Sequence, residues 1–313
     1  MQKPFLMALA AALVWSSAAL AEVPKVVATV KPLHSLVAAV MGDLGTPALI
    51  VRGAASPHTY SLKPSDAQNL QSANLVFWTG HGLELFLEGS IGTLAPHATI
   101  VELSKARGIE LLSPRESGAF EEHADDEPHA HAAEDHAGHA HGEEADMHFF
   151  LDPANARVMV AAIADSLATA DPEHADTYRA NAASTTADLD ALIAEVEASL
   201  APVKDRPFVV FHDAYQYFEA RFGLTLAGTV TVSPEAMPGA GRIDELRTKV
   251  AELGATCVFA EPNFQPAIVN TIVEGTEAKV GTLDPEGSAL SEGPGLYVEL
   301  LRTLATDIAD CLN

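Results

Sequence analysis

The 313-residue sequence has few basic side chains, few cysteines and no long apolar run in its body. Lysine and arginine together number 18 against 43 aspartates and glutamates, which gives a formal net charge of −25. Nucleic acids and anionic membranes are recognised through clusters of basic side chains, so neither is expected as a partner. Beyond the N-terminus, no uninterrupted apolar stretch reaches the roughly 18 residues that a membrane-spanning helix needs. We therefore expect a soluble, acidic protein that meets cations.

The N-terminus has the three parts of a secretory signal peptide. Lys3 supplies the positive start, an apolar run extends over residues 5–14, and a small-x-small cleavage sequence stands at residues 19–21. The apolar run is too short to span a bilayer comfortably, which makes a membrane anchor the weaker alternative. We expect residues 1–21 to be removed on export.

The two cysteines are Cys257 and Cys311. An even number of cysteines in an exported protein is typical of a disulfide, which here would tie a C-terminal strand to the last helix. Metal ligation by cysteine is the alternative, but C-x-x-C spacing is absent. The exported compartment favours the disulfide.

One segment, residues 116–147, holds six of the 13 histidines, eleven carboxylates and no lysine or arginine. Its composition cannot bury enough apolar surface to order it, so we expect a flexible acidic loop. Imidazole and carboxylate groups bind borderline divalent cations. This favours an auxiliary collector of weakly bound metal over a merely solvated spacer. The candidate weak ligands are His123, His129, His131, His136, His139 and His141.

Short apolar runs alternate with helical patterns on both sides of this segment, which predicts parallel sheets covered by helices on both faces. The fold class is therefore α/β, with an N-terminal lobe over residues 22–170 and a C-terminal lobe over residues 202–313. The predicted strands are 26–30, 47–51, 75–79 and 99–103 in the first lobe and 207–211, 224–230, 256–260 and 279–283 in the second. The predicted shorter helices are 34–41, 64–72, 83–94, 214–222, 243–253, 266–276 and 296–311. A further helix is predicted to begin at Pro153, with Asp152 as its N-cap, and to end near Asp171.

A longer helical pattern runs from about Pro172 to Leu200 without an interrupting glycine or proline. At 1.5 Å per residue such a helix is about 42 Å long, roughly the width of a small domain. A helix of this length suits a rigid connection better than a flexible linker. We therefore predict that residues 171–201 form a linking helix between the two lobes.

Open α/β sheets bind ligands outside the carboxyl ends of their strands. Metal-ligand side chains at such positions are His58 after the second strand, His212 after the fifth and Asp284 after the eighth. His148 stands just before a predicted helix at the end of the acidic loop. An isolated histidine is more often a surface or core residue than a ligand, so it is the shared position that selects these residues.

Four separated motifs carry a family resemblance. They are S-P-H-T-Y-S-L-K-P-S-D (56–66), H-F-F-L-D-P (148–153), F-H-D-A-Y-Q-Y-F (211–218) and G-T-L-D-P-E-G (281–287). In this order, the sequence resembles the zinc-specific branch of the metal-binding (cluster A-I, or cluster 9) periplasmic solute-binding proteins of ATP-binding-cassette importers. The histidine-rich insertion is also a feature of that branch. The resemblance implies two Rossmann-like lobes joined by one long rigid helix, with a metal site buried in the interlobe cleft.

By position, the resemblance implies that His58, His148 and His212 are metal ligands. Asp284 matches an aspartate that is the fourth ligand in some relatives. Pro57 stands where some zinc members place a glutamate, which leaves Asp284, water or a histidine of the insertion as the fourth ligand. Three neutral imidazoles with at most one carboxylate suit four-coordinate Zn²⁺, whereas Mn²⁺ prefers more oxygen ligands. The manganese-binding relatives typically have a glutamate at the position of His212.

The expected function is high-affinity capture of Zn²⁺ as transported cargo in the periplasm, by a monomer that delivers it to the membrane permease of an importer. A Mn²⁺- or Fe²⁺-binding member of the same family is an alternative. A secreted zinc hydrolase, with Asp213 or Glu261 as general base, is a weaker one because H-E-x-x-H and a nucleophile elbow are absent. The third alternative is a passive metal-buffering or adhesive surface protein.

Overall fold

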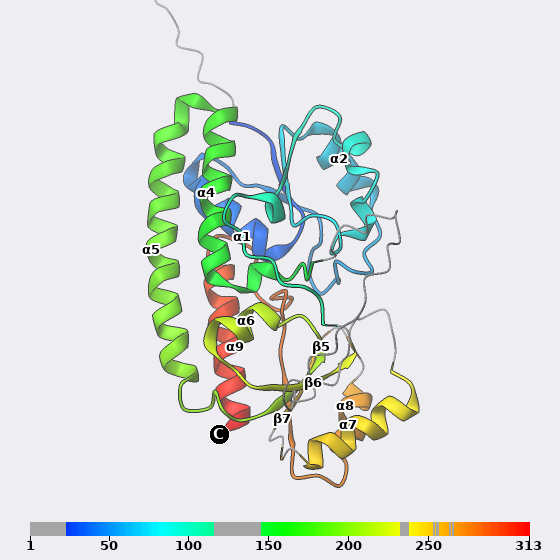
Figure 1. Cartoon of the computed structure of the whole chain (residues 1–313). Helices are drawn as coiled ribbons and strands as arrows, with labels where there is room; N and C mark the ends of the chain where they lie inside the picture. Colours follow the sequence, from blue (N-terminus) through cyan, green and yellow to red (C-terminus); the bar gives the residue numbers. More distant parts are fainter. Residues whose placement is uncertain are drawn as a thin grey trace, which may run out of the picture.

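The computed structural model describes residues 23–115, 145–231, 238–252, 254, 257–262, 264 and 266–313. The predicted signal peptide and the six histidines of the insertion lie outside these residues. The described chain forms two α/β lobes stacked one above the other, with long helices along one side (Figure 1).

The N-terminal lobe contains a four-stranded parallel sheet in the order β2-β1-β3-β4. Its central strands β1 and β3 are buried along their whole length, as expected for a parallel sheet with both faces covered. Its strands are β1 (Val26–Ala28), β2 (Ala48–Leu49), β3 (Leu75–Trp78) and β4 (Thr99–Glu102), and its helices are α1 (Lys31–Met41), α2 (Pro64–Ser72) and α3 (Ile91–Leu94).

The C-terminal lobe repeats this topology, with a four-stranded parallel sheet in the order β6-β5-β7-β8. In each lobe the first and third strands therefore form the central pair. The strands are β5 (Phe208–His212), β6 (Leu226–Thr231), β7 (Cys257–Ala260) and β8 (Lys279–Thr282), and the helices are α6 (Gln216–Phe222), α7 (Ala240–Glu252), α8 (Pro266–Val273) and α9 (Leu296–Leu312).

Two further helices, α4 (Pro153–Ala170) and α5 (Ala175–Leu200), form a hairpin along the side of the molecule. Asp152 caps α4 through a 2.8 Å hydrogen bond from the Ala154 amide, as its position before a proline predicts. The 26 residues of α5 span about 39 Å, and they pack against α4, α1 and α9. The predicted long helix is confirmed, although its first turn is a separate 3₁₀ turn at Pro172–His174. None of the helices within the described residues has the length and apolar character needed to cross a membrane.

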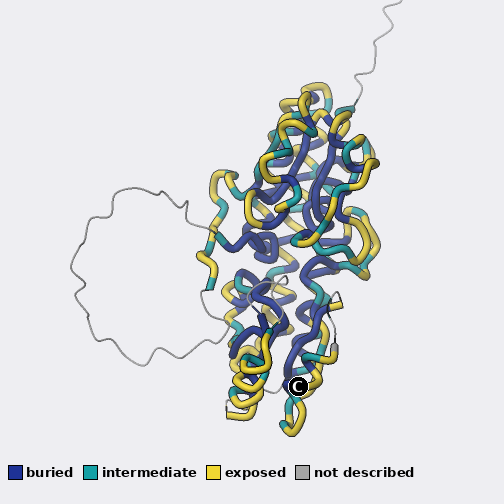
Figure 2. The backbone as a smooth tube through the Cα atoms, turned by 90° about the vertical axis from the view of Figure 1, so that its right-hand side faces the viewer, coloured by how far each residue is buried: buried dark blue, intermediate teal, exposed yellow. Residues whose placement is uncertain are grey.

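A continuous apolar core extends through both lobes and beneath the helices that flank them. A smaller apolar cluster fills the other face of the C-terminal sheet, under α7 and α8. Figure 2 shows buried chain in both lobes and at the level where they meet. The lobes are therefore packed against each other over a shared interior.

Polar contacts also join the lobes. The Lys31 ammonium group at the start of α1 is only 4% exposed and donates to three carbonyl oxygens of the 287–290 turn at 2.9–3.0 Å. The Arg221 guanidinium on α6 binds both carboxylate oxygens of Asp152 at 2.7 Å. A charge held by several fixed partners keeps its neighbours in one arrangement, so these contacts stabilise the mutual orientation of the lobes.

The expected helix at 83–94 is wrong as a continuous element. The chain instead forms a 3₁₀ turn at Leu85–Leu87 and the single-turn helix α3, with Gly89 at a φ of +67° between them. Glycine favours this left-handed conformation, which ends a helix. Helix α8 likewise ends at Val273, before Gly275 at a φ of +78°, and not at residue 276.

Cys257 and Cys311 form a disulfide that joins β7 to α9, with a Cα–Cα distance of 6.0 Å. The pairing predicted from the even cysteine count is confirmed. Both cysteines are therefore unavailable as metal ligands.

Candidate metal centre

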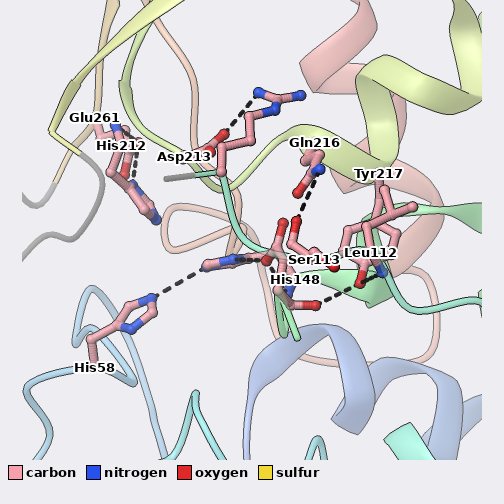
Figure 3. A network of polar contacts seen from close by, with 11 residues as sticks. His58, Leu112, Ser113, His148, His212, Asp213, Gln216, Tyr217 and Glu261 are labelled. Carbon is pink, nitrogen blue, oxygen red and sulfur yellow. Dashed lines mark hydrogen bonds and ion pairs between the residues drawn. The ribbon is translucent and has the colours of Figure 1, made fainter. Parts of the chain in front are cut away.

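Three histidines from different elements meet between the lobes (Figure 3). His58 lies in the loop that follows β2, His148 directly precedes a 3₁₀ turn at Phe149–Leu151, and His212 is the last residue of β5. Their ligand nitrogens all lie within 4.8 Å of one another. We call this group the three-histidine cluster; it brings together three of the four residues selected from the sequence.

The spacing within the cluster matches that of ligands around one ion. The Nε2 atoms of His58 and His148 are 3.2 Å apart. Two nitrogens bound to a tetrahedral zinc ion at 2.0–2.1 Å would be about 3.3 Å apart. The ring centroids of the three histidines are separated by 5.3–5.7 Å, so the three rings surround one small space.

Burial favours the neutral form of His58. Its loss of water contact, together with the neighbouring rings of His148 and His212, lowers the pKa of the His58 ring to about 2. Neutral imidazole is the form that binds a metal. His58 is thus ready to act as a ligand at physiological pH without losing a proton.

His212 presents an unpaired nitrogen to the centre of the cluster. Its Nε2 atom is buried and has no hydrogen-bond partner among the described residues. On the other side of the ring, Nδ1 lies 2.6 Å from a carboxylate oxygen of Glu261, the residue that follows β7. Although burial opposes the charged ring, this carboxylate raises the pKa of His212 above its ordinary value.

His148 has a similar carboxylate partner. Its Nδ1 atom lies 2.8 Å from an oxygen of Asp146, which also accepts the His148 backbone amide at 3.0 Å. The backbone carbonyl of Asp146 in turn accepts the Tyr217 hydroxyl at 2.6 Å. His148 is therefore fixed both to its own loop and to α6 of the other lobe.

Asp284 does not join the three-histidine cluster in this structure. Its carboxylate accepts the backbone amides of Glu286 and Ser288 at 3.2 and 2.6 Å and the Ser288 hydroxyl at 2.7 Å. These contacts cap the turn that follows β8. Its role as a fourth ligand stays a prediction.

The two candidate general bases have other partners. Asp213 forms a 2.9 Å ion pair with Arg115, and Glu261 lies behind the His212 ring. A carboxylate bonded to Nδ1 cannot also activate a water held at Nε2, because the two nitrogens point to opposite sides of the ring. The geometry gives the hydrolase hypothesis no base.

Sequence reasoning did not identify Asp146, and it considered Glu261 only as a general base of the hydrolase alternative and not as a partner of His212. Asp146 stands two residues before His148, a local spacing that was open to inspection. Glu261 follows a strand, which is the same criterion that selected His212 and Asp284. Glu261 reaches His212 because β7 lies beside β5. This neighbourhood is known only from the observed strand order.

Residues 26–311 match the family model described as zinc-uptake complex component A, periplasmic (ZnuA). The chain is 48% identical over 305 residues to the high-affinity zinc uptake system protein ZnuA of Brucella suis, covering 92% of this chain and 91% of that protein. It is 38% identical over 348 residues to the protein of the same name from Paracoccus denitrificans, with 100% and 99% coverage.

The fold matches solved structures as well. A crystal structure of ZnuA superposes with a TM-score of 0.75 at 24% sequence identity, covering 93% of this chain and 99% of the other. At this identity the likeness concerns the fold. It agrees with the two parallel-sheet lobes and the long helix α5 described above.

Proposed function

The chain belongs to the ZnuA family of periplasmic zinc-uptake components, and from this premise we propose that His58, His148 and His212 bind one transported Zn²⁺ ion. The family consists of solute-binding proteins of zinc importers and not of enzymes. In this role the ion is cargo, so the site must both hold it and release it.

One observation carries the proposal: the buried Nε2 atom of His212, which has no hydrogen-bond partner in the described part of the chain, faces two further histidines. Leaving such a nitrogen unpaired costs about 1–3 kcal/mol, which a bound cation would offset. Three neutral nitrogen donors in a confined space suit zinc, which accepts four-coordinate nitrogen sites. The donor set suits Mn²⁺ less well, since that ion prefers oxygen ligands.

The wider role follows from the same premise. We propose that residues 1–21 direct export, that the protein works as a monomer, and that it passes zinc to the membrane permease of an ATP-binding-cassette importer. The proposed boundaries are lobes at 22–170 and 202–313 with residues 171–201 between them. The histidines of the 116–147 insertion are proposed to collect additional, weakly bound zinc.

Metal content and competition titration test the proposed ligands. Protein purified without added metal should retain one zinc ion per chain against a chromogenic chelator, and His58→Ala should lose that ion. Mn²⁺ and Fe²⁺ should fail to displace zinc at equal concentration. Unchanged zinc affinity in His58→Ala, or ready displacement by Mn²⁺, would contradict the proposal.

A further inference from the structure

Two of the three histidines each have a buried carboxylate on the side of the ring that faces away from the cluster. Asp146 is 8% exposed and lies 2.8 Å from Nδ1 of His148, and Glu261 is 4% exposed and lies 2.6 Å from Nδ1 of His212. The two carboxylates belong to different lobes. We call these contacts the two carboxylate pairs.

Resting on the proposed zinc function, we propose that Asp146 and Glu261 are positioning residues that set the affinity of the site. An ionised carboxylate only accepts hydrogen bonds, so it holds the ring with its proton on Nδ1. The lone pair of Nε2 is then directed into the cluster. Each carboxylate thereby selects the ring form and orientation that a metal requires.

The carboxylates also balance charge. Three neutral imidazoles bring no negative charge to a Zn²⁺ ion, whereas two carboxylates one ring-width away supply −2. Because the surroundings are buried, this attraction is screened less than in water. The acidic groups therefore stabilise the cation without entering its coordination shell, which keeps the donor set nitrogen-rich and selective for zinc over oxygen-preferring ions.

The chain contains a matched pair outside the cluster. Asp171, at the turn between α4 and α5, is 4% exposed and lies 2.8 Å from Nδ1 of His174. It also accepts the Tyr178 hydroxyl at 2.9 Å. Asp171→Asn removes an equally buried charge from an equally close histidine, so it controls for any general effect on the fold.

The decisive variants are Asp146→Asn and Glu261→Gln, which keep a hydrogen-bond acceptor but remove the charge. Competition titration should show each to bind zinc about 10- to 100-fold more weakly than the unmodified chain. The double variant should bind zinc more weakly than either single variant, and because both carboxylates act on the same ion its effect should depart from the product of the two single effects. Asp171→Asn should leave the affinity unchanged.

Cobalt substitution separates positioning from folding. With Co²⁺ as the probe, the amide variants should keep the tetrahedral visible spectrum of the unmodified protein, because the three imidazoles remain. Asp146→Ala and Glu261→Ala should shift that spectrum, since the freed ring can rotate. A purely structural role would lower the thermal stability of the metal-free protein without changing the cobalt spectrum.

The outcomes separate this inference from the proposed function. If the unmodified protein binds zinc tightly and both amide variants stay within about threefold of it, the inference fails while the function stands. Equal weakening in Asp171→Asn would also overturn it. If an amide variant does not fold, Asp146→Glu and Glu261→Asp keep the charge and should bind more tightly than the alanine variants. The reverse order would refute a role for charge.

Discussion

The two sheets have the same strand order, but their central strands end differently. In the N-terminal lobe the buried carboxylate of Glu84 accepts the Thr29 hydroxyl at 2.5 Å, the Thr79 amide at 3.0 Å and the Thr79 hydroxyl. In the C-terminal lobe Glu261 accepts from His212, whose other ring nitrogen has no partner among the described residues. In the N-terminal lobe, Glu84 therefore has several hydrogen-bond donors around its carboxylate. In the C-terminal lobe, the residue bonded to Glu261 keeps one ring nitrogen available.

The comparison shows how one topology serves two purposes. Each threonine has a single hydroxyl group, which donates its hydrogen to Glu84. The imidazole of His212 has two nitrogens, and the one opposite Glu261 points toward the other two histidines. In the N-terminal lobe His58 comes from the loop after the edge strand β2, and His148 comes from the segment before α4. The residue at the strand end therefore decides whether a donor nitrogen is left facing the three-histidine cluster.

Removing the Nε2 atom of His212 should have the largest effect on zinc affinity. His212→Ala is expected to weaken zinc binding by about 300- to 8,000-fold, because one of three ligands of a site worth about 10–16 kcal/mol contributes about 3–5 kcal/mol. Competition titration measures this loss. His97→Ala, which removes an exposed histidine outside the cluster, is the matched control and should bind normally. Equal affinity in the two variants would remove His212 from the site.

Acidification should affect the two lobes unequally. The pKa of His212 is raised, so zinc must displace its proton, while the pKa of His58 is lowered to about 2 and that ring has none to lose between pH 7 and 5. Zinc affinity should fall about tenfold per pH unit for each proton that zinc displaces. The number of displaced protons should be above zero, because of His212, and below three, because His58 has none to lose. Titrations at several pH values check this slope. A flat profile, or a slope of three, would contradict the assignment.

Removing the hydrogen bonds of Glu84 should lower the stability of the protein and leave metal binding intact. Burial raises the pKa of Glu84, and Glu84→Ala leaves the Thr79 amide without its partner. We expect the free energy of unfolding to drop by about 1–3 kcal/mol. Urea denaturation of the metal-free protein measures the loss, and zinc affinity should stay within about threefold. A large loss of zinc affinity in the folded Glu84→Ala variant would show that the strand ends of both sheets contribute to zinc binding.

The smallest effect on the tight site is expected from deleting residues 116–144. The Asp146 amide donates to the Leu112 carbonyl at 2.9 Å, so the two ends of the segment are already held together. The deletion stops before Asp146 in order to keep the carboxylate pair with His148. Tight affinity should change by less than about twofold while the total zinc bound per chain decreases. Loss of tight binding would make a histidine of the segment a principal ligand.

Much of this arrangement was predictable because parallel sheets place strand ends at a common edge. That rule selected His58 and His212, and the apolar runs predicted all eight strands in order. Boundaries were less accurate: α1 begins at Lys31, three residues before the predicted start, because Pro32 fits the first turn of a helix. Local signals of this kind act over a few residues and are easily misplaced.

The contacts that complete the site were not predictable in the same way. Glu261 and His212 are 49 residues apart, and only the adjacency of β5 and β7 brings them together. The donors that occupy Asp284 come from the turn that it caps, which favours a structural interpretation that the family resemblance did not give. Sequence patterns located the three histidines of the cluster, while the partners of their rings depended on tertiary packing.

The Lys31 contact with the 287–290 turn has a practical consequence for building a zinc sensor. Because the lobes are held together by a buried ammonium group and by the Arg221–Asp152 pair, a fluorophore on each lobe would report little change in separation. The loop that carries His58 is a better attachment point at its exposed residue Ala54, whereas a substitution of the neighbouring Gly53, at a φ of +65°, would strain the backbone. A single environment-sensitive dye at that loop should give the larger optical response.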